Sequence, residues 1–382
     1  MLNVHVYPSP FEYETRILKV TKSLVEAGLV SRVLVIAKAA PGLPERAEID
    51  AQREVLRVPT GGRSDHFWTK VLGFVSWTLR VLWVLRREPV GMVNCHSLSV
   101  LPLCVVLARL HGALLVYEPH ELETETATFT GWRKTVGKWV ERRLIGFAVK
   151  VIVVSESIAE HYRRDYGLDD VPVIMNVPVL DADAQIAANR SLRDHFKIPD
   201  GDLIFMYQGA LEEERGTLEL LNAFMDAGAD KHLVFMGFGS LEARIDEVAQ
   251  THANVHRYPA VPPGQVINFT RGADVGFALL DSDCENHRCA LPNKLFHYLH
   301  AGLPVIVSDL PEMGRIVDHY ACGWRVENTP GSILARVEAL TLADIETARA
   351  GARRARTELH WAREAAYLEQ IYRRLLDLPV TA

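Results

Sequence analysis

Hydrophobic and polar positions follow a repeated order along the chain, in which short apolar runs alternate with longer amphipathic segments. The runs are rich in β-branched residues and predict strands, whereas the segments repeat their apolar positions every three or four residues and predict helices. In the first half, strands are expected at residues 2–6, 32–37, 90–94, 113–117 and 150–154, with a helix at 12–27. This alternation is typical of a parallel sheet with crossover helices, so residues 1–176 are predicted to form one doubly wound domain.

The same order begins again after a connecting stretch. Residues 171–178 carry two prolines and residues 180–188 are small and polar, which predicts an interdomain connection. Strands are then expected at 203–208, 233–236, 254–258, 274–280 and 304–308, with a helix at 217–227 and a long helical region at 334–378. The prediction is an α/β chain with two Rossmann-like doubly wound domains. Ligands of open sheets bind beyond the carboxyl ends of the strands, so the chemistry is expected in a central cleft between two such edges.

Composition narrows the class of protein. The 382 residues are 48% hydrophobic and 24% charged, which is ordinary for a globular chain and excludes a mainly disordered or collagen-like one. A net charge of −6 argues against a dedicated nucleic-acid binder. Five cysteines without a C-x-x-C pair predict neither a disulfide framework nor structural zinc, and favour a reducing, cytoplasmic setting. Residues 1–16 lack the pattern of a secretory signal, and the most apolar window, 71–85, is shorter than the roughly 20 residues of a membrane span.

The first stretch with candidate chemistry is 117–122 (YEPHEL), which directly follows a predicted strand. His120 is therefore expected at the carboxyl edge of the first sheet, where it can hydrogen-bond a polar ligand. The alternative is a loop histidine that only caps neighbouring backbone.

Two glycine-containing turns follow strands in the second half. Gly209 ends one strand, and Arg215 with Gly216 precedes a predicted helix, which is an arrangement suited to phosphate. A solvated charge run is the alternative for Arg215 and the preferred interpretation of residues 212–214. Gly237 and Gly239 form a lone G-x-G that lacks the third glycine of a dinucleotide fingerprint, which argues against a nicotinamide or flavin dehydrogenase.

The strongest motif is 286–306. Pro292 is predicted to open a helix that ends at Gly302, with Lys294, His297 and His300 at three-residue steps. The helix dipole and Lys294 both favour an anion at the helix start. The alternative is an amphipathic helix whose charged face meets solvent.

Together these motifs resemble the retaining glycosyltransferases of family four, which have the GT-B fold. The resemblance runs in order over nearly the whole chain. It is carried by residues 120–125 (HELETE), 140–144 (VERRL), 154–158 (VSESI), 176–178 (NVP), Gly209 with Arg215-Gly216, and 291–305. The family implies an acceptor-binding domain at 1–176, a donor-binding domain at 177–355, and a C-terminal helix at 356–382 that packs back on the first domain.

The resemblance also implies roles for single residues. Arg215 and Lys294 would bind the donor diphosphate and stabilise the charge that develops on the leaving group, and His120 would approach the donor sugar. Gly237 and Gly239 would let the backbone pass close to the nucleotide, and Val261 would flank the base. Donor binding would be completed by Gly209, Leu291, Asn293 and His297. The implied reaction is a hexosyltransferase-like transfer from a nucleoside-diphosphate sugar to an acceptor hydroxyl, with no metal and no other cofactor.

Some positions depart from the family pattern. Cys289 and His297 stand where the family often has two glutamates, Ala210 stands for an arginine, and residues 7–10 (YPSP) replace a Gly-Gly loop. These departures leave open a catalytically degenerate GT-B protein that binds a nucleotide sugar or a partner. A nucleotide-sugar epimerase ranks lower, because no added acid and base carboxylates can be placed.

Two segments, 66–87 and 129–143, combine tryptophan with basic residues. Such faces suit an interfacial helix on an anionic membrane, which predicts peripheral contact at the inner membrane face. The alternative is that the tryptophans pack into the first domain's core.

Overall fold

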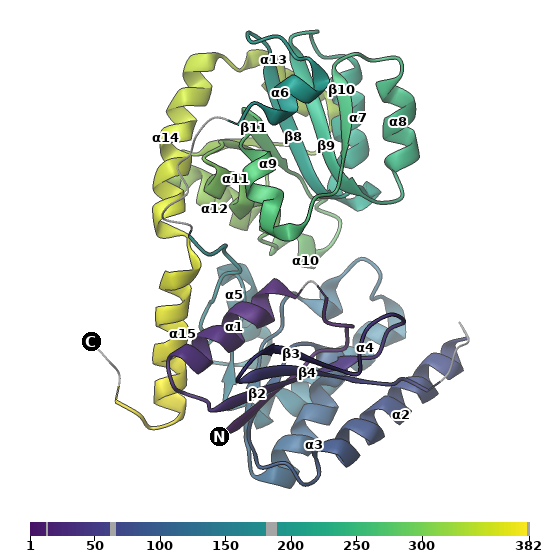
Figure 1. Cartoon of the computed structure of the whole chain (residues 1–382), viewed down its shortest axis with the longest axis vertical. Helices are drawn as coiled ribbons and strands as arrows, with labels where there is room; N and C mark the ends of the chain where they lie inside the picture. Colours follow the sequence, from purple (N-terminus) through teal and green to yellow (C-terminus); the bar gives the residue numbers. More distant parts are fainter. Residues whose placement is uncertain (13, 62–65, 181–188, 380–382) are drawn as a thin grey trace. The chain divides into compact units, whose positions relative to one another are not determined.

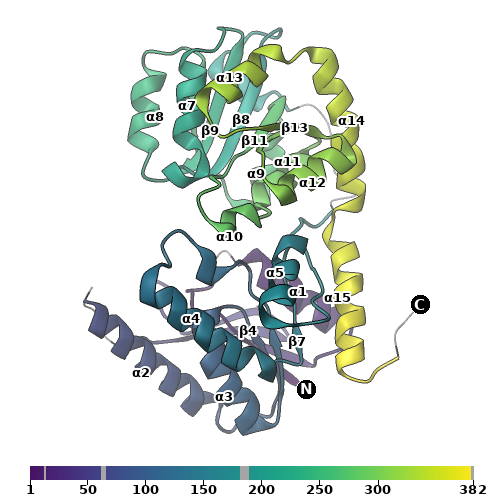
Figure 2. The ribbon, with the colours of Figure 1, turned by 180° about the vertical axis from the view of Figure 1, so that it is seen from behind.

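The computed structural model describes residues 1–12, 14–61, 66–180 and 189–379. The chain forms two compact units (Figures 1 and 2). Unit 1 comprises Met1–Met175 with Glu364–Ala382, and unit 2 comprises Asn176–Arg363. Most of the expected connection at 180–188 lies outside the described residues.

Unit 1 is built on a seven-stranded sheet of order β3-β4-β2-β1-β5-β6-β7. The central strand β1 pairs in parallel with both β2 and β5. The strands are β1 (Leu2–Val6), β2 (Arg32–Lys38), β3 (Arg46–Asp50), β4 (Arg53–Val58), β5 (Val90–Cys95), β6 (Leu114–Tyr117) and β7 (Lys150–Val151). The strands β3 and β4 were not predicted, and β3 runs antiparallel to β4 at the sheet's edge.

Helices cover both faces of this sheet. In Figure 1 α1 lies in front of the sheet, and in Figure 2 α3 and α4 lie in front of it. The helices of unit 1 are α1 (Thr15–Glu26), α2 (Phe67–Leu85), α3 (Leu101–His111), α4 (Gly131–Leu144), α5 (Glu156–Tyr166) and most of α15 (Trp361–Leu375), with short 3-10 turns η1 (Leu98–Val100), η2 (Glu123–Glu125) and η3 (Ile145–Phe147). The apolar face of α1 is buried through Ile17, Val20 and Leu24, as its helical spacing predicts. Within the described residues, no helix combines the length and the apolar character that a membrane span requires.

Unit 2 has a six-stranded parallel sheet of order β10-β9-β8-β11-β12-β13. Its strands are β8 (Leu203–Ala210), β9 (Lys231–Phe238), β10 (Val255–Pro259), β11 (Val275–Ala278), β12 (Val305–Ser308) and β13 (Gly323–Val326). The core beside it is aromatic, with Phe205, Phe235 and Phe277 fully buried. The predicted fold class, two Rossmann-like units with mainly parallel sheets, is confirmed.

The helices of unit 2 include the one that carries Lys294. They are α6 (Ser191–Phe196), α7 (Thr217–Met225), α8 (Glu242–Ala249), α9 (Val266–Thr270), α10 (Glu285–Arg288), α11 (Asn293–Ala301), α12 (Pro311–Tyr320), α13 (Pro330–Ala339) and α14 (Leu342–Glu358), with turns η4 (Glu213–Arg215) and η5 (Pro263–Gln265). A Cβ atom at Gly276 would lie 2.3 Å from the ring of Tyr298, so this glycine lets α11 pack closely on β11. The hydroxyl of Tyr298 accepts a hydrogen bond from the backbone N–H of Gln208, which ties α11 to β8 as well.

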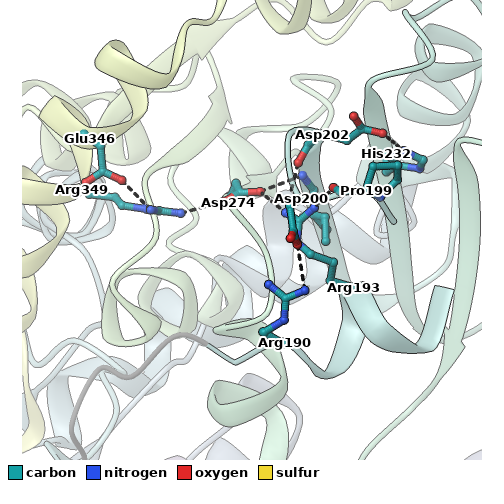
Figure 3. A network of polar contacts seen from close by, with 10 residues as sticks. Arg190, Arg193, Pro199, Asp200, Asp202, His232, Asp274, Glu346 and Arg349 are labelled. Carbon is teal, nitrogen blue, oxygen red and sulfur yellow. Dashed lines mark hydrogen bonds and ion pairs between the residues drawn. The ribbon is translucent and has the colours of Figure 1, made fainter. Parts of the chain in front are cut away.

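The predicted helical region at 334–378 contains parts of three helices, α13, α14 and α15, and α14 belongs to unit 2. Asp274, just before β11, accepts from Arg349 of α14 at 2.8 Å and from Arg193 of α6 at 3.4 Å (Figure 3). It also accepts from the backbone N–H of Ile204. These bonds lie at the amino ends of β8 and β11, so they hold α14 on unit 2 at the end opposite to the carboxyl edge. The boundary between the units accordingly falls after Arg363 and not at 355.

Candidate functional site

Lys294 occupies the first turn of α11 and is buried, so the alternative of a charged face that meets solvent is wrong for this residue. Its ammonium lies 3.7 Å from the centre of the Tyr207 ring and has no hydrogen-bond partner among the described residues. Burial lowers the pKa of Lys294 well below its usual range, and the nearby charge of Arg215 lowers it further. A buried cation without an acceptor is costly, so this site is suited to an anionic ligand.

Arg215 lies at the end of η4 and is exposed. The next residue, Gly216, has a φ of 68° and precedes the first turn of α7. A Cβ atom there would lie 2.7 Å from both Asn328 Oδ1 and Leu279 Cβ, so only glycine fits this turn. From this position the charge of Arg215 acts on Lys294, whose pKa it lowers.

His297 lies one turn after Lys294 on α11 and contacts Gln208 of β8. Its Nδ1 atom lies 3.2 Å from Nε2 of Gln208, and Oε1 of Gln208 accepts from the hydroxyl of Thr270 at 2.5 Å. In this orientation of the Gln208 amide, Nδ1 of His297 accepts from Nε2 of Gln208. A histidine can either donate or accept a hydrogen bond at this position, whereas an ionised glutamate would only accept one.

Close backbone packing and backbone conformation, without any ligand, already require glycine at several positions of the candidate site. Gly209 has a φ of 116° and pairs with Gly237 across β8 and β9. A Cβ atom at Gly237 would lie 1.8 Å from the carbonyl oxygen of Gly209, and one at Gly239 would lie 2.4 Å from that of Leu211. Strand packing alone therefore demands glycine at positions 237 and 239.

The remaining predicted donor-binding residues are Val261, Leu291 and Asn293. Val261 lies half-buried in the loop after β10, and Leu291 is half-buried just before α11. Asn293 is exposed at the first position of α11, where its Oδ1 atom accepts from Nδ2 of Asn176 at 2.9 Å.

Two expectations about unit 2 are wrong. Pro292 has an extended ψ of 137° and precedes α11 as its cap instead of opening it. His300 does not converge with Lys294, because it is buried and its Nε2 atom contacts the carbonyl oxygen of Leu359 at 2.8 Å. The interpretation of residues 212–214 as a solvated charge run agrees with the exposure of Glu213 and Glu214, and the carboxylate of Glu212 accepts from the N–H and the hydroxyl of Ser240 at the surface.

In unit 1, His120 follows β6 and is half-buried at the carboxyl edge of the sheet. Its Nε2 atom lies 3.1 Å from Nδ1 of His96, and its ring lies 5.6 Å from that of Tyr7. His96 in turn contacts His5 at 2.8 Å. Burial lowers the pKa of all three histidines, that of His96 to about 3, so the imidazoles are neutral at pH 7.

Five further polar residues of unit 1 were not predicted from the sequence: His5, His96, Asn3, Asn94 and Glu118. All five are buried; four lie at or near the carboxyl ends of β1, β5 and β6, and Asn3 lies near the amino end of β1. A signal for them exists, because polar residues recur two positions apart in otherwise apolar strands and thus share one face of the sheet.

The tryptophans of α2 and α4 are mostly exposed. Trp68 and Trp83 are 73% and 63% exposed, and Trp132 and Trp139 are 67% and 59% exposed. Only Trp77 of these five is buried, and it donates to the carbonyl of Ala37. The alternative that these tryptophans pack into the core is therefore wrong for four of them.

The cysteines form no disulfide, and Cys289 is buried. Among the described residues, one group has metal-ligand character: Asp283, Cys284 and His287, whose ligand atoms lie within 4.8 Å of one another. The contact of Nδ1 of His287 with Asp283 at 3.0 Å spans one turn around α10 and accounts for part of the group as an ordinary helical pair.

Two family models match the chain in sequence order. The glycosyl transferase 4-like domain matches residues 12–177, and the glycosyl transferases group 1 match residues 189–357. Together they span most of the chain, which belongs to the glycosyltransferases of the GT-B fold. No curated protein matches the chain in sequence.

Solved structures share the fold along the full length at low sequence identity. Sucrose-phosphate synthase from Thermosynechococcus elongatus has a TM-score of 0.79 at 16% identity, with 99% of each chain covered. Anabaena HepE, solved with UDP and glucose, has a TM-score of 0.72 at 13% identity, with 99% of this chain and 100% of HepE covered. WaaG, a glycosyltransferase of lipopolysaccharide biosynthesis, has a TM-score of 0.66 at 14% identity, with 97% of this chain and 99% of WaaG covered.

Proposed function

We propose that this chain is a retaining glycosyltransferase that moves a sugar from a nucleoside-diphosphate donor to an acceptor hydroxyl without a metal. The observation that carries the proposal is the buried, unpartnered ammonium of Lys294 beside the charge of Arg215. Retention of configuration rests on the resemblance of the motifs to family four.

The chemistry of the donor explains why such a cation is retained. Cleavage of the bond between a sugar and a nucleoside diphosphate leaves negative charge on the departing phosphate. A cation already held in a dry site lowers the barrier because it needs no reorganisation during the reaction. In this proposal Lys294 and Arg215 bind the diphosphate, and the N-terminus of α11 adds its partial positive charge.

With the diphosphate bound at Lys294 and Arg215, the other parts of the donor substrate can be assigned to predicted residues. His297 forms a hydrogen bond with a ribose hydroxyl, and the loop at Val261 flanks the base. Unit 1 supplies His120 toward the sugar and binds the acceptor. HepE was solved with UDP and with UDP-glucose, which supports a uracil nucleotide and a hexose as the first donor to test.

The experiment is a thermal-shift series with UDP, GDP, ADP and UDP-glucose. A ligand at one hundred times its Kd stabilises the folded state by about 2.7 kcal/mol, which raises the Tm of a domain of this size by about 5–10 °C. Lys294→Met removes the buried unpaired charge, so the free variant is expected to melt at a higher temperature than the wild type and to lose the nucleotide-induced shift.

The matched control is Lys231→Met. Lys231 is similarly buried in unit 2 but is paired with Asp230, so its loss is expected to lower the Tm and leave the nucleotide-induced shift intact. A full nucleotide shift in Lys294→Met, or no shift with any nucleotide in the wild type, would overturn the diphosphate site.

A catalytically degenerate relative is the second candidate, favoured by Cys289 and His297 at the usual glutamate positions. The two candidates differ in turnover. Slow release of UDP from UDP-glucose in water supports the enzyme, whereas tight binding without turnover over a panel of acceptors supports the binding protein.

We also propose that unit 1 binds an anionic lipid surface through α2 and α4, which both pack against α3. Leu72, Leu79 and Trp83 line an exposed groove on α2, and α2 contains no acidic residue. The guanidinium groups of Arg86 and Arg143 lie 4.0 and 5.6 Å from the rings of Trp83 and Trp139. Exposed indoles beside cations suit the boundary between acyl chains and anionic headgroups.

A further inference from the structure

A continuous chain of hydrogen bonds leads inward from His120 through three strands of unit 1. His120 Nε2 lies 3.1 Å from His96 Nδ1, and His96 Nε2 lies 2.8 Å from His5 Nδ1. His5 Nε2 then lies 2.6 Å from Asn3 Oδ1. The rings of His5 and His96 are stacked at 5.1 Å, so the relay is also packed as a unit.

The inner end of the chain is fixed by a carboxylate. Asn94 donates from Nδ2 to Oε1 of Glu118 at 2.6 Å, and Arg16 lies 3.8 Å from the other carboxylate oxygen. Oε1 of Glu118 also accepts from the hydroxyl of Tyr372 at 3.3 Å, so the amide nitrogen of Asn94 faces Glu118 and its oxygen faces Asn3. Asn3 therefore donates from Nδ2 to Asn94 Oδ1 at 2.8 Å and presents its own oxygen to His5.

This orientation determines where each histidine carries its proton. Because Asn3 Oδ1 accepts, His5 carries its proton on Nε2 and has a bare Nδ1. His5 Nδ1 then accepts from His96 Nε2–H, and His96 Nδ1 accepts from His120 Nε2–H. The series ends with a lone pair on Nδ1 of His120, which forms no hydrogen bond with a described residue.

We propose that Asn3, His5, His96 and Asn94 are positioning residues that hold His120 in the Nε2–H tautomer, so that its Nδ1 accepts a hydrogen bond from a sugar hydroxyl. This role rests on the proposed function for its substrate, but the tautomer itself does not. If His120 exchanged freely between its two neutral tautomers, Nδ1 would carry a proton in part of the population and would then donate instead of accept. The relay excludes that tautomer.

The first test measures the tautomer in the wild-type protein. Nitrogen-15 NMR of the histidine side chains distinguishes protonated from bare ring nitrogens, and the ligand-free chain suffices. The expected result is a proton on Nε2 and a bare Nδ1 for His120, His96 and His5 at pH 7. A proton on Nδ1 of His120 would overturn the proposal, whatever the enzyme's activity.

The second test breaks the relay while keeping its packing. His5→Phe preserves a ring against His96 but removes the acceptor for His96 Nε2–H, and Asn3→Leu removes the acceptor for His5. Both variants are expected to show mixed tautomers at His120 and a fall of about ten- to one-hundred-fold in kcat for UDP release from UDP-glucose, with Kd for UDP unchanged.

The matched control is His256→Phe in unit 2. His256 and His232 form a similar pair, with a contact of 3.0 Å and stacked rings at 5.3 Å, outside the relay. This variant is expected to leave kcat and the tautomer of His120 unchanged. An unchanged kcat in both relay variants despite mixed tautomers would refute the positioning role and leave the proposed function standing. Absence of UDP binding would refute the proposed function and leave the tautomer result standing.

Discussion

At the scale of the residue, Gly237 separates a structural requirement from a ligand requirement. Its Cβ would meet the carbonyl oxygen of Gly209 at 1.8 Å, so Gly237→Ala must move the backbone of β8 or β9. We expect the variant to lower the free energy of unfolding by about 3 kcal/mol, measured by urea denaturation without ligand. Gly331→Ala is the control, because nothing lies within 4 Å of its Cβ and alanine favours a helix. Unchanged stability with weaker UDP binding in Gly237→Ala would show that the glycine serves the nucleotide alone.

Residues that stand out locally can be predicted from the sequence at this scale, whereas those whose role depends on pairing between strands cannot. Lys294 and Arg215 were found because cations next to helix starts are visible in one dimension. His5 and His96 were missed because the polar positions of each strand gain a role only through strand pairing, and only the parallel register that places His5 opposite Asn94 brings them together. Burial of Lys294 was also unpredictable, because it depends on Gly276 admitting α11 to the sheet.

At the scale of the element, the exposed face of α2 makes a prediction about lipid binding. Leu72→Glu with Leu79→Glu places two carboxylates on that face, where they repel anionic headgroups and cost apolar burial. We expect this double variant to lose at least ten-fold in affinity for vesicles containing phosphatidylglycerol, measured by co-sedimentation. Leu342→Glu is the control, because Leu342 is 65% exposed but lies on α14. Equal binding of the wild type, the double variant and the control would contradict a membrane role for α2. Equal binding of the wild type to neutral and to anionic vesicles would contradict recognition of an anionic surface.

Elements with strong apolar periodicity were predicted well, and the misses have physical reasons. The strands β2 and β8 are nearly continuous apolar runs because both faces of a parallel sheet are covered. By contrast, β3 has an exposed, charged sequence (RAEID) because it is an edge strand, and its place is set by pairing with β4. The break between α13 and α14 was missed although Thr341 and Asp344 form a capping box there, which sequence spacing could have indicated.

At the scale of the whole molecule, two units with separate cores are expected to unfold in separate steps. Val337 is fully buried in the core of unit 2, so Val337→Ala is expected to shift the calorimetric transition of that unit alone. The transition that does not move then belongs to unit 1. A single transition that shifts as a whole would contradict independent units.

Once the calorimetric transition of unit 1 is identified, its pH dependence can be predicted from the buried histidines. The pKa values of His5, His96 and His120 are lowered by burial, so below pH 6.5 the unfolded state binds up to three more protons than the folded state. Burial raises the pKa of Glu123 to about 7, so between pH 4.5 and 7 the folded state holds one proton that the unfolded state releases. For these four groups the net difference is about two protons, which predicts that the free energy of unfolding of unit 1 falls by about 2.7 kcal/mol for each pH unit between 6 and 5. His161 of unit 1, whose pKa is also lowered by burial, acts in the same direction. Calorimetry at those two pH values tests this slope, and a unit 1 transition that stays constant or rises on acidification would show that the three imidazoles are not held neutral in the folded protein.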